Sequence, residues 1–352
     1  MNDDLRYRVD DLISYTESLF SGHGMDADKA AIVAPLLVEA DMMGHDTHGL
    51  QLAAGYLKAL SSGDMSGQGM PAVINDHGAA LALQGSRISG VWLTAYGIDQ
   101  AIGRAGQYGT ATVVIRESHH IACLAAFLRR ATDANCMIIL ASSDPSVASV
   151  APFGGITPVF TPNPIAIGIP TEDDPILIDI SASITTNGMT GRLHNEGRSL
   201  THPWVQDAAG NATTDPGALF TDPPGTILPI GGKDHGHKGY GLALMIEAMT
   251  QALSGYGRAD GPSQWGASVF IQVIDPAAFG GSDAYLRQSS WLAAACQASP
   301  PAPGTDAVRL PGQRAMARRR AALANGLSLY PGIMDALAPL AERLNISPPT
   351  PI

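Results

Sequence analysis

Two groups of histidines have neighbours that could support proton transfer. His48 lies between Thr47 and Gly49, so a hydroxyl stands beside the imidazole and the glycine lets a ligand approach the backbone closely. A histidine in this setting suits a proton donor whose pKa lies near the operating pH. Helix capping and packing in polar pockets would account for His45 and His48 equally well, so both interpretations stay open.

The second group is the pair His119 and His120, which follows a probable strand at residues 111–115 and opens a helix. The carboxyl end of a strand is where α/β proteins place ligands. Adjacent imidazoles on a helix point apart, and no carboxylate or cysteine completes a coordination set at metal-site spacing, here or beside His235 and His237. We therefore expect no metal, and favour proton transfer or contact with a nucleotide ribose.

A glycine-rich segment, Gly231–Gly241, is the best candidate for a phosphate cradle. It combines five glycines with Lys233 and Lys238, directly before an apolar helix. Backbone amides at a helix N-terminus and a nearby ammonium group together form an anion site. The segment is no Walker loop, because His237 stands where that motif requires lysine.

Residues 22–27 match the dinucleotide fingerprint G-x-G-x-x-A, but their context argues against it. The fingerprint needs a strand before the glycine turn, whereas the preceding residues have helical periodicity. We predict a turn between two helices there, with no part in binding.

The spacing of apolar residues predicts helices at both ends of the chain and an α/β region between them. The predicted helices cover residues 5–20, 27–43, 50–60, 94–104, 122–134 and 240–253, with further helix after residue 289 interrupted by a loop at 298–312. The predicted strands cover residues 79–83, 111–115, 137–141, 176–180 and 265–274. We expect the two terminal helical regions to pack together as one lobe.

Composition excludes several classes of protein. The net charge of −11 argues against nucleic acid or an anionic membrane as a partner, since either would need a basic surface. The first eleven residues are polar, and the three cysteines form no CxxC spacing. These features predict a cytoplasmic protein with reduced thiols.

Seven elements, in the same order along the chain, resemble the malate/L-lactate dehydrogenase-like family. That family includes ureidoglycolate dehydrogenase, 2,3-diketogulonate reductase, sulfolactate dehydrogenase and a cyclic ketimine reductase. The elements are Thr47–Gly49, His119–His120, Ala151–Gly155, Asn163–Pro164, Ile178–Ser183, Leu228–Pro229 and Lys238–Gly239. The resemblance implies a non-Rossmann α/β fold: a helical lobe from residues 1–70 and 288–352, and an NAD(P)-binding α/β domain over residues 71–287.

The resemblance also implies roles for individual residues. His48 would be the proton donor, Thr47 its partner, and His120 the second candidate for acid/base work, with Asp179 orienting a histidine or touching the cofactor. NAD or NADP would be held by His120, Ser143, Asp144, Asn163, Asp179, Ser181, Ser183, His237, Lys238, Gly312, Gln313 and Arg314. Family members form dimers with active sites near the subunit boundary, so we expect a homodimer.

One position departs from the family pattern. The family motif continues to an arginine five residues after its serine, and Leu52 occupies that position here. A leucine cannot pair with a substrate carboxylate as arginine does. Arg116, Arg192 or Arg198 would take that role, or the substrate lacks a carboxylate at this point.

These observations predict hydride transfer between a nicotinamide and a 2-oxo/2-hydroxy acid or cyclic imine. The alternative is a hydrolase, a lyase or a non-catalytic binding protein on the same scaffold. Nucleophilic hydrolysis has little support, because the sequence contains no G-x-S-x-G elbow.

Overall fold

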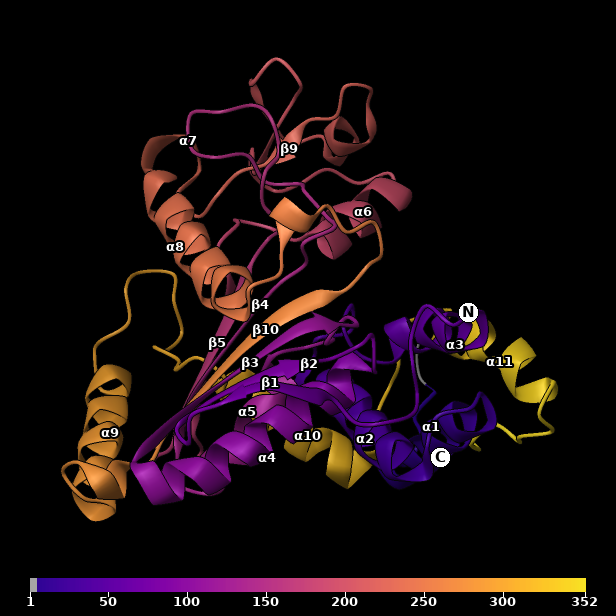
Figure 1. Ribbon diagram of the computed structural model, residues 1–352. Helices are drawn as coiled ribbons and strands as arrows, with labels where there is room; N and C mark the ends of the chain where they lie inside the picture. The colour runs from indigo at the N-terminus through magenta and orange to yellow at the C-terminus, as the bar shows by residue number, and fades with distance from the viewer. Residues whose placement is uncertain (1–4) are drawn as a thin grey trace.

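A seven-stranded sheet forms the centre of the molecule in a computed structural model that describes residues 5–352 (Figure 1). The strand order is β1-β2-β3-β10-β4-β5-β6, and only the β2–β3 pair is parallel. The strands are β1 (Ala72–Asp76), β2 (Ala80–Gln84), β3 (Thr110–Ser118), β4 (Met137–Ser143), β5 (Pro164–Ile169), β6 (Ile176–Ser181) and β10 (Ala267–Ile274). A small second sheet has the order β8-β7-β9, over Ala212–Thr213, Val205–Gln206 and Thr226–Ile227.

Eleven α-helices surround these sheets within the described residues. They are α1 (Val9–Gly22), α2 (Ala27–Met43), α3 (Ala53–Ser62), α4 (Gly90–Tyr108), α5 (Ala125–Thr132), α6 (Asn187–Asn195), α7 (Gly232–His235), α8 (His237–Glu247), α9 (Ser282–Gln297), α10 (Gln313–Asn325) and α11 (Ile333–Glu342). Helix α8 continues into a π-helical turn, Ala248–Ala252. Within residues 5–352, no helix combines the length and apolar character needed to cross a membrane.

Strand β10, at the centre of the large sheet, is covered by other elements on both faces. Its residues are apolar almost without interruption and nearly all buried, as expected for a strand covered on both faces. One face of the sheet packs against α4, which covers β10 and β3, and against α5, which covers β4 to β6, in a core that continues into the terminal helices. The other face of the sheet packs against α8 and its π-helical turn, in a separate core that includes residues of the small sheet. The cavity described below lies between the sheet and this second, upper part.

Most predicted elements are present, and the predicted α/β class is confirmed. The structure adds strands β1 and β5, which the sequence analysis did not identify, and its first helix begins at Val9 rather than Leu5. Residues 22–27 form a turn between α1 and α2, so the predicted helix–turn–helix context is confirmed. The predicted division into a terminal lobe and a central domain stays a prediction, and its residues 1–4 lie outside the described part of the chain.

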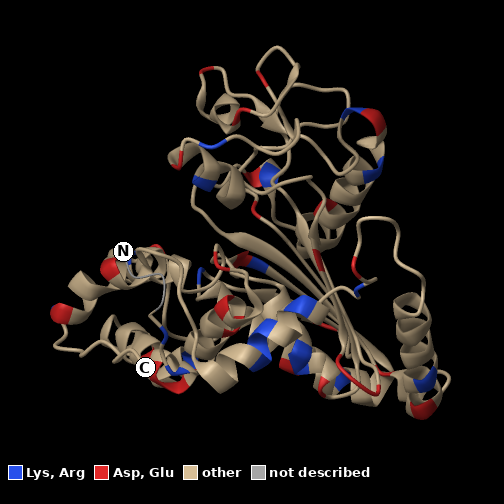
Figure 2. Ribbon diagram, turned by 180° about the vertical axis from the view of Figure 1, so that it is seen from behind, with Lys and Arg blue, Asp and Glu red and all other residues tan. Residues whose placement is uncertain are grey.

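Charged residues of both signs are interspersed over the outer faces of the helices (Figure 2). Helix α10 shows how the arginines are used: Arg319 binds Glu39 on α2 at 2.7 Å, and Arg320 binds Asp174 at 2.6 Å. These ion pairs join α10 to the body of the protein, so the arginines of this helix serve packing at least in part.

Candidate active site

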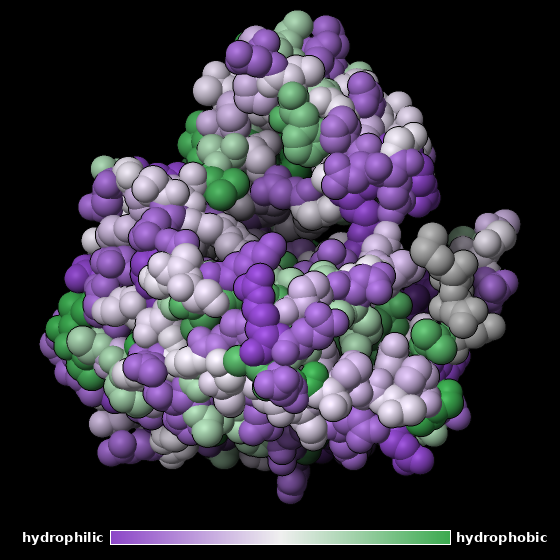
Figure 3. All heavy atoms as spheres, turned by 90° about the vertical axis from the view of Figure 1, so that its right-hand side faces the viewer, coloured by the Kyte–Doolittle hydropathy of each residue, from purple (hydrophilic) through white to green (hydrophobic). Residues whose placement is uncertain are grey.

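A cavity of about 490 Å³ lies between the sheet and the upper part of the molecule, where Figure 3 shows a hollow. This volume is within the usual range for small-molecule sites. Its walls come from the loops around His48 and His120, the ends of β4 and β6, the start of α6, and Trp265. The cavity therefore collects segments that are far apart in the sequence.

His48 lines this cavity and is held by its neighbour. The Thr47 hydroxyl lies 2.8 Å from the Nδ1 atom of His48, which leaves Nε2 for a ligand. Burial, with smaller contributions from His45 and Arg192, lowers the pKa of His48 to about 4. The sequence analysis expected a value near neutral pH, and burial is the reason for the difference. His48 is a neutral imidazole at pH 7 until a ligand changes its surroundings.

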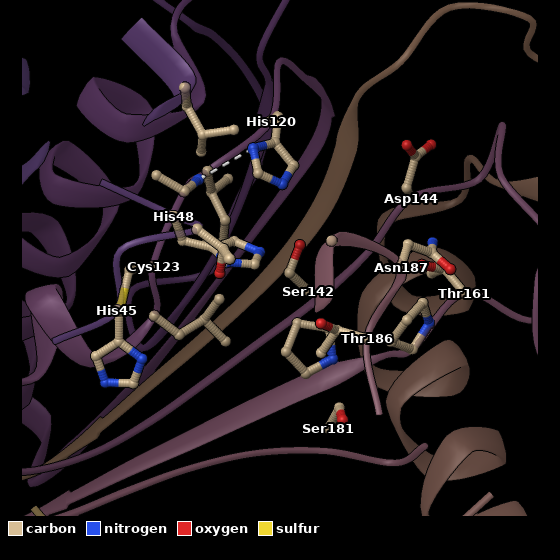
Figure 4. A pocket seen from close by; sticks show the side chains of 18 of the residues that line it. His45, His48, His120, Cys123, Ser142, Asp144, Thr161, Ser181, Thr186 and Asn187 are labelled. Atoms are coloured by element: carbon tan, nitrogen blue, oxygen red, sulfur yellow. Dashed lines mark hydrogen bonds between the residues drawn. The ribbon is translucent and has the colours of Figure 1, made fainter. Parts of the chain in front are cut away.

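His120 is fixed in one tautomer by two hydrogen bonds. The amide of Ala122 donates to its Nδ1 at 3.3 Å, and the Tyr56 hydroxyl lies 2.6 Å from the same atom. Because an amide can only donate, Nδ1 is an acceptor and the proton of the neutral ring is on Nε2. Burial, then His48 and His119, lower the pKa of His120 well below its usual value, so the ring is neutral. Figure 4 shows its second nitrogen directed into the cavity.

Trp265 closes one side of the site. Its ring stacks on His120, with centroids 4.3 Å apart and 23° between the planes, and it is 40% exposed. The rings of His48 and His120 lie 6.1 Å apart. Two neutral imidazoles and an indole face thus surround one space, a suitable environment for a flat ligand with a polar atom.

Four other residues of the predicted site also line the cavity: Thr47, Asp144, Asp179 and Ser181. Asp179, on β6, accepts a hydrogen bond from the amide of Ala125 at 2.9 Å and so caps α5. Burial raises the pKa values of Asp179 and Asp144. Their carboxyl groups therefore face the cavity from a poorly solvated position.

The remaining predicted cofactor residues do not line this cavity. Ser143 and Asn163 are buried behind it, and both bind Glu247, at 2.8 and 2.9 Å. Ser183 bonds to the neighbouring carbonyl of Thr185, in a turn that follows Ser181. The rest are His237 and Lys238, exposed at the start of α8, and Gly312, Gln313 and Arg314 at the start of α10. Their predicted contact with cofactor stays a prediction.

Gly312 and Gln313 lie at a different hollow. A second cavity, of about 480 Å³, is lined by Gln313, Leu310 and the 171–175 loop, beside α9. Gly312 has φ of +83° and packs on Leu177 of β6, so a side chain there would collide with the strand. The backbone conformation and the close packing at this position therefore require glycine, whether or not a cofactor binds there.

The lining of the 490 Å³ cavity contains no lysine or arginine among residues 5–352, although Leu52 is part of it. The three arginines considered as replacements lie outside it. Arg116 binds Gln84, Arg198 binds Glu196, and Arg192 binds Asp46 at 3.1 Å. Arg192 is nonetheless close enough to lower the pKa of His48. Of the three, it is the best placed to reach a substrate anion.

Beneath the His48 loop lies a buried carboxyl group, Asp41. Its Oδ2 accepts from the Leu50 amide at 2.7 Å, while its Oδ1 has no partner. Burial is the main cause that raises its pKa to about 7. A raised carboxyl pKa means that stability is present at low pH and is lost as pH rises from about 4 to 7, as the group is forced to ionise.

Asp41→Asn removes this ionisation and keeps the shape of the side chain. We expect equal unfolding free energies near pH 4, and a variant more stable by about 1–3 kcal/mol at pH 7.5 and above, the usual cost of a poorly satisfied buried group. Chemical denaturation across this pH range measures the difference. A difference independent of pH would contradict the assignment, and Asp10→Asn, on the exposed face of α1, is the control.

Comparison with known proteins decides the family. The family model for malate/L-lactate dehydrogenase matches residues 7–338. The chain belongs to this family. It is 31% identical to an L-lactate dehydrogenase of Cupriavidus necator over 339 residues, covering 94% of this chain and 96% of that protein. Membership makes the chain an oxidoreductase and implies a nicotinamide cofactor.

Solved structures of the malate/L-lactate dehydrogenase family have the same fold. A Δ1-piperideine-2-carboxylate reductase from Pseudomonas syringae superposes with a TM-score of 0.82 at 27% identity, covering 96% of this chain and 99% of that one. A malate dehydrogenase from Entamoeba histolytica superposes with a TM-score of 0.92 at 23% identity, covering 98% and 99%. The relatives named here are all dehydrogenases or reductases, and none supports the hydrolase or lyase alternative.

The structure adds site residues that the sequence analysis missed. Tyr56 is on α3, the helix that follows the His48 motif, and Trp265 is in the loop before β10. Neither residue belongs to a recognisable sequence motif. Ser142 was overlooked beside the predicted Ser143, although alternate strand residues face opposite sides. That alternation was the one signal available in the sequence.

Proposed function

We propose that this enzyme transfers a hydride between a nicotinamide and either the carbonyl carbon of a 2-oxo acid or the imine carbon of a cyclic ketimine. One observation carries the proposal: His48 and His120 line the same cavity, each with Nδ1 engaged by a hydroxyl and Nε2 free for a ligand. Relatives named as lactate dehydrogenase and piperideine-carboxylate reductase support both substrate classes.

A nicotinamide held at this site would supply the hydride in the reducing direction, and negative charge would then develop on the substrate oxygen or nitrogen. His120 donates a hydrogen bond from Nε2 to that atom and fixes its position. An anionic substrate beside His48 would oppose the desolvation that keeps its pKa low, so the ring would take a proton from solvent when the substrate binds and give it to the substrate oxygen or nitrogen as the hydride arrives. Thr47 keeps the His48 ring oriented throughout.

The residues at the cavity fit the nicotinamide end of the cofactor. Trp265 offers an exposed aromatic face, and Asp144, Ser142 and Ser181 offer polar atoms that suit a ribose. Lys238 and the turn at Asp179–Ser183 stay our candidates for contacts further along the dinucleotide. Both NADH and NADPH are tested, since nothing at this end of the site distinguishes them.

Cofactor binding should quench the fluorescence of Trp265, because reduced nicotinamide absorbs where tryptophan emits. We expect NADH or NADPH to quench wild type by energy transfer, Trp265→Phe to lose most of this quenching, and Trp291→Phe on the distant α9 to retain it. At 100 times the Kd, the cofactor should also stabilise the fold by about 2.7 kcal/mol. Thermal stabilisation without Trp265 quenching would place the nicotinamide elsewhere.

We also propose a homodimer formed through α9; because this helix lies away from the cavity, the expected position of the active site near the subunit boundary stays a separate prediction. This helix has no buried residue, and in Figure 1 it stands apart from the body. Its Trp291 and Leu292 are 67% and 53% exposed. Helix α9 is held to the body through Ser289 and Ser290 but leaves these large apolar side chains in water, and a second copy of the chain would cover both by symmetry.

Light scattering tests this assembly. Wild type should have twice the 36.5 kDa mass of the chain at micromolar concentration, and Trp291→Glu should shift it toward the monomer. Phe220→Glu changes another exposed aromatic side chain, on the upper part of the molecule, and should leave the dimer intact. A wild-type monomer, or a dimer that survives Trp291→Glu, would contradict the proposal.

The proposal includes a cytoplasmic location and no nucleic-acid or membrane partner. The three cysteines are free thiols in the described part of the chain, which suits a reducing compartment. The acidic net charge and the interspersed charges of Figure 2 suit a small-molecule enzyme better than a polyanion-binding protein.

A further inference from the structure

Three side chains that the proposed reaction does not require as donors or acceptors of protons converge at one edge of the cavity. His45, Cys123 and Asp179 each bring a ligand atom, and these atoms lie within 4.8 Å of one another. Figure 4 shows Cys123 directly beside His45. They come from three segments: the loop after α2, the loop before α5, and strand β6. The sequence analysis considered only histidine pairs and so did not identify this set.

We propose that His45, Cys123 and Asp179 form a binding site for a divalent transition metal of the Zn²⁺ class. Thiolate, imidazole and carboxylate are the donors that Zn²⁺ prefers, and three protein ligands leave one tetrahedral position open. Binding forms a metal–sulfur bond, and the Cys123 proton leaves to solvent. The thiolate and carboxylate then balance the two positive charges, so the loaded site is neutral, as a buried site should be.

The distances in the cluster suit this assignment. The Sγ atom of Cys123 lies 3.9 Å from Asp179 Oδ2, within a small side-chain adjustment of two ligands on one ion. Oδ2 also accepts from Ala125, which orients the carboxylate as outer hydrogen bonds do in metal sites. Cys123 is buried, so its side chain is already held in place.

The electrostatics favour a cation at this position. Asp41 is buried beneath the His48 loop with one carboxyl oxygen unpartnered, and Asp179 lines the cavity wall. Apart from the histidines, none of the described residues that line the cavity is basic. A divalent ion would relieve this accumulation of acidic groups.

The site also bears on substrate recognition, and this one point rests on the proposed function. Leu52 cannot bind a substrate carboxylate, and a metal in the same cavity would offer an open position to such an anion. The proposed metal site itself does not depend on the proposed reaction, because its three ligands and their distances are the same for any substrate.

Titration of the untagged protein with Co²⁺ tests the site without any assay of activity. Bound thiolate gives Co²⁺ an intense near-ultraviolet charge-transfer band, which surface histidines do not. We expect this band with one ion per chain, its displacement by Zn²⁺, and its loss in Cys123→Ser. Cys136→Ser, which removes another buried thiol, should retain the band. Affinity should rise with pH, because binding releases the thiol proton.

His45→Ala provides a second variant in case Cys123→Ser fails to fold. It should keep the fold by thermal melting and weaken Co²⁺ binding by about tenfold or more, as loss of a ligand does. Absence of a thiolate band in wild type would overturn the proposal, as would a band that persists in Cys123→Ser or disappears in Cys296→Ser. Dehydrogenase activity without metal binding would reject the site and leave the proposed function intact.

Discussion

His48→Asn is expected to lower kcat by about 10²–10⁴-fold, the usual loss when a general acid is removed. The change keeps a similar polar volume beside Thr47 but removes the atom that carries the proton. Cofactor affinity should change little, because Trp265 and the ribose-facing residues are untouched. Steady-state kinetics with a cofactor titration separate the two effects.

His120 provides the competing assignment. If His48→Asn keeps most of its activity while His120→Asn loses it, the proton donor is His120 and the roles are reversed. Tyr56 then becomes informative, because its hydroxyl lies 2.6 Å from the Nδ1 atom of His120 and helps to hold that ring in place. His235→Asn, at an exposed histidine in α7, is the control and should behave as wild type.

Leu52→Arg is expected to raise kcat/KM for pyruvate by roughly 10–100-fold. The wild-type wall offers an apolar side chain where a carboxylate would need a charged partner, so small 2-oxo acids should be poor substrates of the metal-free enzyme, in which the comparison is made. A charge-assisted hydrogen bond contributes about 1.5–3 kcal/mol, which corresponds to the stated gain. The measurement compares pyruvate with a cyclic imine in both proteins.

Leu52→Met keeps the wall apolar and should leave pyruvate a poor substrate. Efficient pyruvate reduction by wild type would contradict the expectation for Leu52 and show that another group binds the carboxylate. Arg192 would be the first to test, because it acts electrostatically on His48 from α6.

The sequence predicts the elements of this fold better than their arrangement. Apolar runs such as residues 137–141 and 265–274 identify β4 and β10, but not that the late β10 lies between β3 and β4. Strand β1 was missed because it is an exposed edge strand without the alternation of a half-buried one. Pairing between distant segments depends on packing that no local pattern records.

For the site, too, the sequence predicts local features better than the contacts between distant segments. Thr47–His48 and His120 were found because their local chemistry is unusual, and both groups do line one cavity. The values of their pKa could not be found from the sequence, because burial determines them. Tyr56, Trp265 and Cys123 join the site through tertiary contacts alone. Ser143 and Asn163 show the opposite case, because the sequence assigned them to the site but the structure does not. Both bind Glu247 in a buried polar network behind the cavity wall.

The most direct test of the proposed function follows nicotinamide absorbance during turnover. Purified protein is mixed with NADH or NADPH and a panel of 2-oxo acids and cyclic imines, with His48→Asn in parallel. We predict substrate-dependent oxidation of at least one cofactor by wild type, greatly slowed in the variant. A protein that binds either cofactor but oxidises neither with any member of the panel would contradict the proposed reaction, and equal rates in wild type and His48→Asn would contradict its proton donor.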